Sequence, residues 1–426
     1  MHDPRELIAS GPDAVRRLAR RRYELDVAAL DEAHRGRATA QAEVTRLRTE
    51  MNRAARDRGR SGPPSEQDKE AARALRADVQ RAETAARAAG HRFADLVLAI
   101  PNIPLDTVPD GDSEKEAVEI RRGGPAPCEA ADARHHADVG EALGILDGRA
   151  AARLSGARFS VSRGPGARLE RALTDFFLDL HTGEHGYTEQ SVPFLVSRDT
   201  MTGTGQLPKF EDDLFATKVG DRELFLIPTA EVPLTNLLAQ QTLDLRAMPY
   251  AFTSRTPCFR AEAGAYGRDT RGILRLHQFE KVELVRVCAP EDAQEQLELM
   301  VGHAEECLRR LELSYRVVLL PAGDLGFSAR MTYDIEVWLP GSGSYREISS
   351  VSDCGTFQAR RAGIRHRTAD GRKEHVATLN GSALPIGRTV AALLEQGTRP
   401  DGSVELPEAL VSYTGFRRIL PDGTTE

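Results

Sequence analysis

The chain has 426 residues and a net charge of −7, with 57 Lys and Arg against 64 Asp and Glu. This length is enough for two domains with a large core, and the acidic balance excludes a basic protein that coats nucleic acid with its whole surface. The first residues lack the apolar core of a signal peptide and no apolar run approaches the ~20 residues that span a bilayer, so we expect no membrane association.

Five cysteines lie at irregular spacings and form no CxxC pair. This usage predicts reduced, mostly buried thiols in a cytoplasmic protein. It also argues against a zinc site, which needs clustered Cys and His ligands.

The N-terminal quarter has the pattern of a helical hairpin. After a short amphipathic helix within residues 1–25, apolar residues keep a seven-residue spacing up to Ala54, with Arg37 as the one break. A polar stretch with Gly and Pro, residues 58–67, interrupts the pattern, which resumes from Ala72 to Ile100. Two heptad helices joined by a short turn must pack antiparallel. We therefore predict an antiparallel coiled-coil arm over about residues 27–100.

The charge of this hairpin differs from that of the rest of the chain. The segment from Asp31 to Arg92 has a balance of +4, whereas the remainder has −11. One interpretation is a solvated coiled coil for dimerisation or spacing. The other is an arm that grips RNA, because double-stranded RNA is recognised by shape and phosphates more than by base edges.

Pro101 and Pro104 end the second helix and predict a domain boundary at residue 104, with the second domain over residues 105–426. We interpret residues 105–150 as a linker into that domain. His135 and His136 fall within it. Without a paired Cys or carboxylate pattern we interpret them as surface histidines.

The second domain has the pattern of an α+β fold. A helix with one apolar stripe begins at Gly166, and the strand that follows is broken by Pro193, which cannot occupy a central strand. Short strands then follow over residues 224–350, with one helix over residues 291–313, as in an antiparallel sheet. No GxGxxG or GxxxxGK[ST] loop is present, which disfavours a Rossmann or P-loop nucleotide site.

Residues 258–284 read CFRAEAGAYGRDTRGILRLHQFEKVEL. Two strand-like ends flank a Gly-rich loop that contains four arginines, Arg260, Arg268, Arg271 and Arg275. Arg donates bidentate hydrogen bonds to phosphate oxygens, so this hairpin suits a polyanion, although an Arg-rich surface loop is the plainer interpretation.

This stretch resembles motif 2 of the class II aminoacyl-tRNA synthetases, in the form used by seryl-tRNA synthetases of the bacterial type. Three further stretches resemble the same family in the same order: LIPTAEVPLTN at 226–236, EISSVSDCGTFQARR at 347–361 and LNGSALPIGRT at 379–389. The resemblance extends to about Phe416. It implies an α+β class II catalytic domain with an antiparallel sheet, preceded by the helical arm, with motif 1 at about 166–196, motif 2 at about 258–284 and motif 3 at about 379–395.

The resemblance implies a serine–tRNA ligase. Such an enzyme activates L-serine with ATP and Mg²⁺ to seryl-adenylate and transfers the seryl group to the terminal adenosine of tRNA(Ser), with tRNA(Sec) as a further candidate acceptor. In this family the helical arm holds the tRNA and motif 1 forms a homodimer interface. Both features are therefore expected here.

The resemblance also implies an ATP site. Arg260 would bridge the serine carboxylate and the α-phosphate, Glu262 would accept from the adenine amino group, and Arg275 would reach the outer phosphates. Phe279 and Arg388 would stack on the two faces of adenine. Arg260, Glu262 and Arg388 are thus the implied catalytic residues. The implied ATP site also includes Ala261, Leu276, Glu347, Ile348, Ser349 and Ser350, with Glu347 and Ser350 as the magnesium ligands.

A serine site is implied in the same way. Thr229, Ala230 and Glu231 would hold the α-ammonium group. Glu283, Asn380 and Ser382 would read the hydroxyl and close the pocket. A buried site that pairs with a hydroxyl rejects analogues without it by ~10⁴ or more, because its own polar groups are left unpaired.

The chain departs from the usual family pattern at six positions near these motifs: Ala261, Tyr266, Val351, Asp353, Ala383 and Pro385. They motivate the hypothesis of a divergent second copy that tolerates a serine-mimicking inhibitor or serves a biosynthetic pathway. A ligase that loads a carrier protein is disfavoured by the arm. A non-catalytic paralogue is disfavoured by the retention of Arg260, Glu262, Glu347 and Arg388.

Overall fold

The computed structural model describes residues 1–58, 65–127, 133–263, 271–368 and 370–426. Within these ranges the chain divides into two compact units, Met1–Pro101 and Asn102–Glu426, and each is described by itself. Arg268, Tyr266 and Cys128, which the sequence singles out, lie outside the described residues, as does most of the polar stretch at 58–67.

The N-terminal unit consists of four helices: α1 Pro4–Ala9, α2 Gly11–Ala19, α3 Val27–Arg58 and α4 Glu66–Ala99. The predicted coiled-coil arm is confirmed in α3 and α4. Arg48 in α3 donates to Glu83 in α4 at 2.6 Å, and the Arg37 guanidinium lies 4.4 Å from the centre of the Phe93 ring. Partners that run in opposite directions along the two helices require antiparallel packing. The break in the heptad pattern is therefore filled by a cation–π contact.

The second unit is built on one eight-stranded sheet with the order β1-β9-β10-β11-β14-β8-β7-β2. Every neighbouring pair in it is antiparallel except β2 and β7. The antiparallel class II sheet predicted from the sequence is confirmed. The strands of this sheet are β1 Val118–Gly123, β2 Thr188–Glu189, β7 Tyr250–Phe259, β8 Gln278–Cys288, β9 Tyr315–Leu319, β10 Met331–Leu339, β11 Ser344–Asp353 and β14 Ala377–Pro385.

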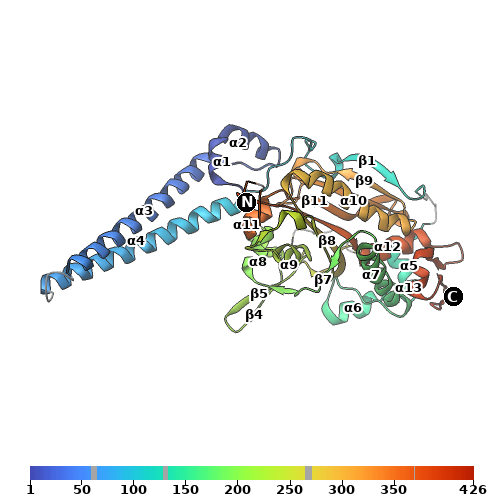
Figure 1. Ribbon diagram of the computed structural model, residues 1–426. Helices are drawn as coiled ribbons and strands as arrows, with labels where there is room; N and C mark the ends of the chain where they lie inside the picture. Colours follow the sequence, from blue (N-terminus) through green and yellow to red (C-terminus); the bar gives the residue numbers. More distant parts are fainter. Residues whose placement is uncertain (59–64, 128–132, 264–270, 369) are drawn as a thin grey trace. The chain divides into compact units, whose positions relative to one another are not determined.

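Helices and three smaller sheets surround this sheet (Figure 1). The helices are α5 His136–Ala142, α6 Gly148–Ser155, α7 Pro165–Gly183, α8 Arg198–Thr204, α9 Glu231–Asn236, α10 Ala293–Arg310, α11 Phe357–Ala362, α12 Ile386–Gly397 and α13 Glu408–Thr414. The remaining strands are β3 Leu195–Val196, β4 Ala216–Val219, β5 Arg222–Leu226, β6 Thr242–Leu243, β12 Arg365–Arg367, β13 Lys373–His375, β15 Val404–Glu405 and β16 Arg418–Ile419.

The two faces of the sheet are covered differently because side chains alternate along each strand. Val282 and Leu284 of β8 join the large core that contains α7, α10 and α12. Val285 and Val287 of the same strand join a smaller cluster with residues of α9 and α11. Since Lys281 and Glu283 have the parity of Val285, these two polar residues of β8 lie on the α9 and α11 side.

The interpretation of residues 105–150 as a linker is wrong. This segment supplies β1, the edge strand that pairs with β9, and the helices α5 and α6. An edge strand with one solvated face needs few apolar residues, and β1 carries charged residues at three of its six positions. That composition resembles a linker.

Pro193 separates two short strands that belong to different sheets, since β2 pairs with β7 whereas β3 pairs with β5.

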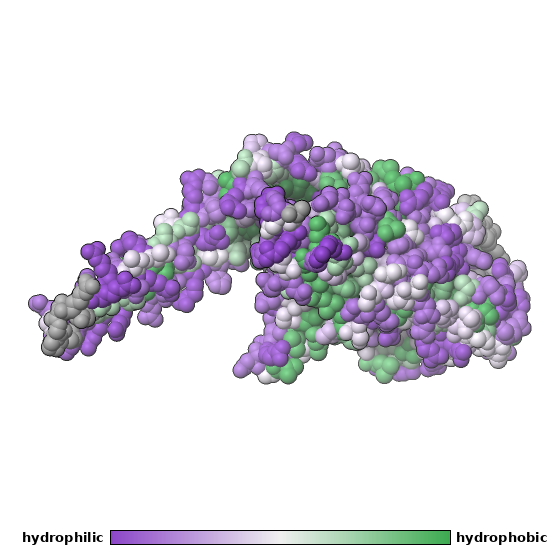
Figure 2. All heavy atoms as spheres, in the orientation of Figure 1, coloured by the Kyte–Doolittle hydropathy of each residue, from purple (hydrophilic) through white to green (hydrophobic). Residues whose placement is uncertain are grey.

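The four cysteines within the described residues, Cys258, Cys288, Cys307 and Cys354, are free and buried, as predicted. Among the described helices, none combines the length and apolarity needed to cross a membrane. The surface of the helical hairpin is mostly hydrophilic in the view of Figure 2.

Candidate active site

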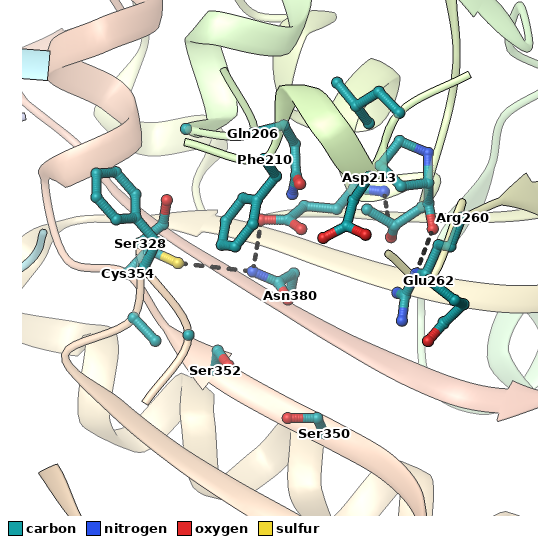
Figure 3. A pocket seen from close by; sticks show the side chains of 18 of the residues that line it. Gln206, Phe210, Asp213, Arg260, Glu262, Ser328, Ser350, Ser352, Cys354 and Asn380 are labelled. Atoms are coloured by element: carbon teal, nitrogen blue, oxygen red, sulfur yellow. Dashed lines mark hydrogen bonds between the residues drawn. The ribbon is translucent and has the colours of Figure 1, made fainter. Parts of the chain in front are cut away.

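A cavity of about 460 Å³ opens on the α9 and α11 side of the sheet (Figure 3). Strand register explains why polar side chains meet there. Asn380 of β14 lies opposite Ser352 of β11 and Val285 of β8, and directly opposed residues point to the same face. Thr229, Glu231, Arg260, Ser350 and Asn380 are among the residues that line this cavity.

Glu231 is the buried acid of this cavity. Its Oε1 accepts from Gln358 Nε2 at 2.5 Å and from Asn380 Nδ2 at 2.9 Å. Burial, with the nearby Glu283 carboxylate, raises the pKa of Glu231 to about 7, because the charged form is desolvated. A carboxylate in this state gains most from a cationic ligand.

Thr229, Lys281 and Glu283 form a second buried network next to Glu231. The Thr229 hydroxyl donates to Glu283 Oε2 at 3.0 Å and accepts from Lys281 Nζ at 3.1 Å. Lys281 also forms an ion pair with Glu283. The network ties the segment before α9 to β8 and leaves the Glu283 carboxylate neutralised by protein groups.

A smaller cavity of about 50 Å³ adjoins the first and is lined by Arg260, Glu262, Arg275, Leu276, Phe279, Lys281, Glu347, Ser382 and Arg388, with Ile273, Leu274, Pro385 and Gly387. Arg260, Glu262 and Arg275 line both cavities. Most of the predicted serine and ATP residues therefore line two adjoining cavities that share Arg260.

The arginines of the second cavity are held by acids and backbone carbonyls. Arg275 Nη1 lies 3.0 Å from Glu262 Oε2, and Arg260 Nε donates to the carbonyl oxygen of Pro228 at 3.3 Å. The Arg260 guanidinium lies 5.2 Å from the centre of the Phe279 ring. Glu262 adopts a φ of 52°, a left-handed conformation that side-chain-bearing residues avoid unless the surroundings enforce it.

A β-bulge brings Glu347 and Ser350 to one face of the sheet. Residues three apart in a regular strand point to opposite faces. Here Ser350 pairs with Asp334 and Glu347 pairs with Glu336, so Ile348 is an extra residue in β11. Both oxygen-bearing side chains thereby share the face of the cavities.

Arg388 of α12 completes this edge of the site. Its Nη1 donates to the Glu347 carbonyl oxygen at 2.7 Å and lies 3.1 Å from Glu347 Oε1. The Arg388 guanidinium lowers the pKa of Glu347. Glu347 is thus held as a carboxylate.

The chain matches two families along its length. Residues 1–104 match the "Seryl-tRNA synthetase N-terminal domain", and residues 211–397 match the "tRNA synthetase class II core domain (G, H, P, S and T)". Serine–tRNA ligase 2 from Streptomyces avermitilis is 82% identical over all 426 residues, covering 100% of both chains. The chain belongs to the seryl-tRNA synthetases.

Other seryl-tRNA synthetases support this assignment. Serine–tRNA ligase from Acidithiobacillus ferrooxidans (strain ATCC 53993 / BNL-5-31) is 51% identical, covering 99% of this chain and 100% of that one. The crystal structure of seryl-tRNA synthetase from Pyrococcus horikoshii complexed with ATP superposes with a TM-score of 0.86 at 35% identity, covering 99% and 100% of the two chains. The protein is therefore a class II ligase that joins serine to tRNA and binds ATP.

Some of the predicted site residues of this synthetase lie behind the cavity walls. The described residues that line the two cavities do not include Ala230, Ala261, Glu283, Ile348 and Ser349. The Ser349 hydroxyl instead donates to the Ser382 carbonyl oxygen at 2.6 Å. Ala230, Glu283, Ile348 and Ser349 are buried, whereas Ala261 is half-buried.

Lys281 and Gln358 are polar residues of the synthetase site that the sequence did not single out. Lys281 could have been found, because it alternates with Phe279 and Glu283 on one strand face. Gln358 has no such signal. It reaches Glu231 only because α11 packs beside α9 and β14, where the Thr378 hydroxyl donates to the Gln358 amide oxygen at 2.7 Å.

The interpretation of His135 and His136 as surface histidines is wrong for His136, which is 0% exposed. With Glu395 the two histidines form a cluster of potential metal ligands within the described residues. Both ring nitrogens of His136 already have protein partners, Glu395 at 2.7 Å and the Ile273 amide at 3.2 Å. His136 therefore links Glu395 to the Ile273 amide and has a structural role here.

The departures from the family pattern occupy different places in the synthetase. Pro385 lines the smaller cavity, whereas Ala383 and Val351 are buried in the sheet. Asp353 is neutralised by Arg330 Nε at 2.8 Å. Pro385 is therefore the described departure with direct access to the proposed ATP side.

Proposed function

We propose that the two adjoining cavities together form one active centre for serine and ATP and that Arg260 lies where the two substrates meet. The observation that carries the proposal is the position of Arg260, which lines both cavities, beside Thr229 and Glu231 in the larger and Phe279 and Arg388 in the smaller. A cation at such a junction can contact two anions that must approach each other.

In the first step a serine carboxylate oxygen attacks the α-phosphorus of ATP. The bond from that phosphorus to the bridging oxygen breaks, and pyrophosphate leaves. Arg260 would neutralise the charge that develops on the α-phosphate oxygens, and Arg275 would contact the outer phosphates. Glu231 would bind the serine ammonium and fix the attacking carboxylate.

Glu347 and Ser350 would hold Mg²⁺, which neutralises phosphate charge when bound. Their carboxylate and hydroxyl are hard oxygen donors on one face of the sheet. The adjacent Asp334 Oδ1 is buried and has no hydrogen-bond partner among the described residues, so the donor set fits a hard cation.

In the second step a ribose hydroxyl of the terminal adenosine of tRNA(Ser) attacks the seryl carbonyl carbon, and AMP leaves. The helical arm would grip the tRNA backbone. An acceptor beyond tRNA(Ser), such as tRNA(Sec), finds no support in the comparisons. We expect the enzyme to act in the cytoplasm, where its tRNA is charged, which cell fractionation would check.

Serine-dependent ATP–pyrophosphate exchange tests the proposed centre. Arg260→Gln keeps a polar side chain but removes the charge and the guanidinium fork, and we expect kcat/KM to fall by about a thousandfold. Arg246→Gln is the control, because Arg246 is exposed and pairs with Asp244 in a surface turn. Exchange by Arg260→Gln at the wild-type rate would refute the assignment.

We also propose that this is a divergent second copy; the Streptomyces relative carries the number 2 in its name. Pro385 at the smaller cavity supports the idea, since a stiff wall there changes the fit of nucleotide mimics more than that of serine. Equal inhibition of this enzyme and an ordinary seryl enzyme by a seryl-adenylate analogue would contradict it.

A further inference from the structure

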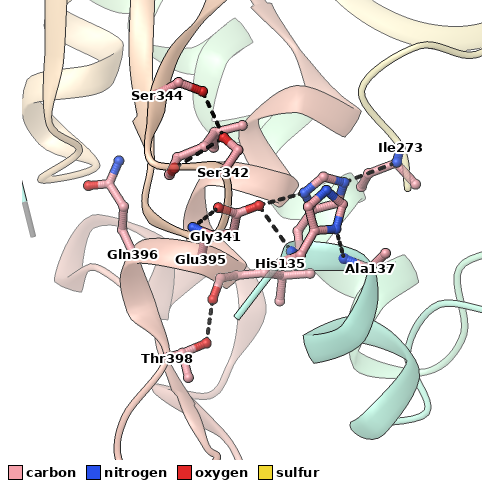
Figure 4. A network of polar contacts seen from close by, with 12 residues as sticks. His135, Ala137, Ile273, Gly341, Ser342, Ser344, Glu395, Gln396 and Thr398 are labelled. Carbon is pink, nitrogen blue, oxygen red and sulfur yellow. Dashed lines mark hydrogen bonds and ion pairs between the residues drawn. The ribbon is translucent and has the colours of Figure 1, made fainter. Parts of the chain in front are cut away.

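His136 occupies a position that the reaction described above does not explain. The ring is fully buried at the start of α5, between Glu395 near the end of α12 and the Ile273 amide. In Figure 4 the Glu395 carboxylate lies between the Gly341 amide and an imidazole ring, with the Ile273 amide on the other side of the ring. Because the Ile273 N–H donates, His136 Nε2 must accept, and Nδ1 therefore donates to the carboxylate.

Glu395 fixes this ring from the other side. Its Oε1 accepts from both the His136 backbone amide at 3.0 Å and the ring at 2.7 Å, and its Oε2 accepts from the Gly341 amide at 2.8 Å. Burial opposes ionisation, but these hydrogen bonds outweigh it and lower the pKa of Glu395. The ring cannot rotate without leaving a buried carboxylate short of donors.

Residues 271–276 form the part of motif 2 that leads from the described end of the loop to Arg275, and we name this segment the motif 2 limb. Helix α12 holds the limb at two adjacent backbone groups. Arg388 Nε donates to the Leu274 carbonyl oxygen at 3.2 Å, and Glu395 acts through His136 on the Ile273 amide. Arg388 and Glu395 are seven positions apart, which corresponds to about 10 Å along α12.

The limb lies directly against the histidine. Gly272 has a φ of +84°, and a Cβ at this position would lie 2.1 Å from His136 Nε2. Arg271 forms an ion pair with Asp138, two residues beyond His136 in α5. The backbone approaches the ring more closely than any residue with a side chain would permit.

We propose that His136 and Glu395 are a positioning pair that fixes the motif 2 limb and so holds Arg275 in place for the outer phosphates of ATP. The proposal rests on the proposed ATP site. The pair touches neither cavity, so it acts through the limb. Loss of the grip frees the backbone next to Arg275 and weakens ATP binding, while Thr229 and Glu231, which belong to other elements, keep their geometry.

Two substitutions of His136 test the two hydrogen bonds of its ring separately. The amide of His136→Asn reaches the place of Nδ1 and can still donate to Glu395, but it leaves the Ile273 amide without an acceptor. The longer His136→Gln returns an acceptor near the place of Nε2. In pyrophosphate exchange we expect His136→Asn to raise KM for ATP about tenfold, the effect of one buried hydrogen bond, with KM for serine within about twofold of wild type. His136→Gln should recover most of the ATP affinity.

Gly272→Ala makes the test independent of whether the histidine variants fold, because it keeps the His136–Glu395 pair intact. Its methyl group must push the limb away from the ring, so KM for ATP should again rise selectively. Gly371→Ala is the matched control, with the same φ of +84° and no atom within 4 Å of the added Cβ. Equal rises in the two substrates' KM values, or none in any variant, would overturn the proposal. Absence of exchange in the wild-type enzyme would instead refute the proposed function.

Discussion

At the scale of single residues, Glu231 shows how burial prepares a group for its ligand. The Glu231 carboxylate accepts amide hydrogen bonds from Gln358 and Asn380, yet burial raises its pKa to about 7. In the empty site the charged form is therefore disfavoured, and it gains most when an ammonium group arrives.

This state predicts a pH dependence. The folded-state pKa lies above the ordinary carboxyl value, so protonation of Glu231 competes with serine as the pH falls below about 7. We expect KM for serine, measured by exchange between about pH 8 and about pH 6, to rise by up to tenfold per pH unit on the acid side. Glu231→Gln keeps an acceptor for Gln358 and should raise KM roughly a hundredfold, with the pH dependence removed.

Although Glu231→Gln should bind serine less tightly, we do not expect it to lower the stability of the fold. Because its pKa is raised, Glu231 lowers the free energy of unfolding as the pH increases from the ordinary carboxyl value to about 7. At about pH 8 Glu231→Gln should therefore unfold at the same temperature as wild type or higher. Glu305→Gln is the control, since Glu305 is a buried carboxylate paired with Arg121 at 2.5 Å outside both cavities. A Glu231→Gln variant with wild-type serine KM would contradict the assignment.

At the scale of elements, the arginines of the hairpin fall into two groups. Arg35, Arg46 and Arg81 each pair with an acid on their own helix. Arg73, Arg76 and Arg87 of α4 are exposed and have no acidic partner among the described residues. Their spacing continues through Gln80, Thr84 and His91 in steps of three and four, so they lie on one helix face. A face of donors without acids suits RNA phosphates.

We expect the triple replacement of Arg73, Arg76 and Arg87 by Gln to lower tRNA charging by roughly tenfold or more. The slope of log K against log salt should become shallower by about two to three. Pyrophosphate exchange needs no tRNA and should not change. The triple replacement of Arg35, Arg46 and Arg81 by Gln, which removes the same charge, should have the smaller effect on charging. Equal effects would mean that only net charge matters.

At the scale of the whole molecule, α7 and the segment around Pro193 leave a surface suited to a second copy. A groove of about 630 Å³ is lined by residues of α7, by Gln190 and Phe194, and by Arg255 with Glu280. Phe194 is 41% exposed and Leu195 is 43% exposed. Large exposed apolar residues beside a groove indicate an interface, and a twofold dimer would bury the same residues from both chains.

We therefore expect light scattering to give twice the mass of the chain. Phe194→Glu should shift the enzyme towards monomer, because it places a charge on the apolar surface that the dimer would bury. Val219→Glu is the control, since Val219 is 62% exposed on β4 and does not line the groove. A wild-type monomer with full activity would refute the dimer.

Several features of this protein could be predicted from the residues alone because their causes are local. Heptad spacing determined the hairpin of α3 and α4, since a seam of apolar residues must be covered by a second helix. The alternation and turn signals predicted β7, β8, β9, β10 and β11, but neither β1 nor β14. The long ordered motifs were sufficient to indicate the family and the set of candidate residues around Arg260, Glu231 and Arg388, which the cavities bring together.

The tertiary structure decided what depends on register and on distant segments. A regular strand would place Glu347 and Ser350 on opposite faces, and only the bulge at Ile348 brings them together. Glu283 is an acidic residue within a sequence motif. In the structure it lies behind the cavity wall, where Lys281 forms an ion pair with its carboxylate and Thr229 donates a hydrogen bond to it. His136 resembles a surface residue in the sequence. Its buried role arises because Glu395, 259 residues further along, packs against it, and no local pattern records such a contact.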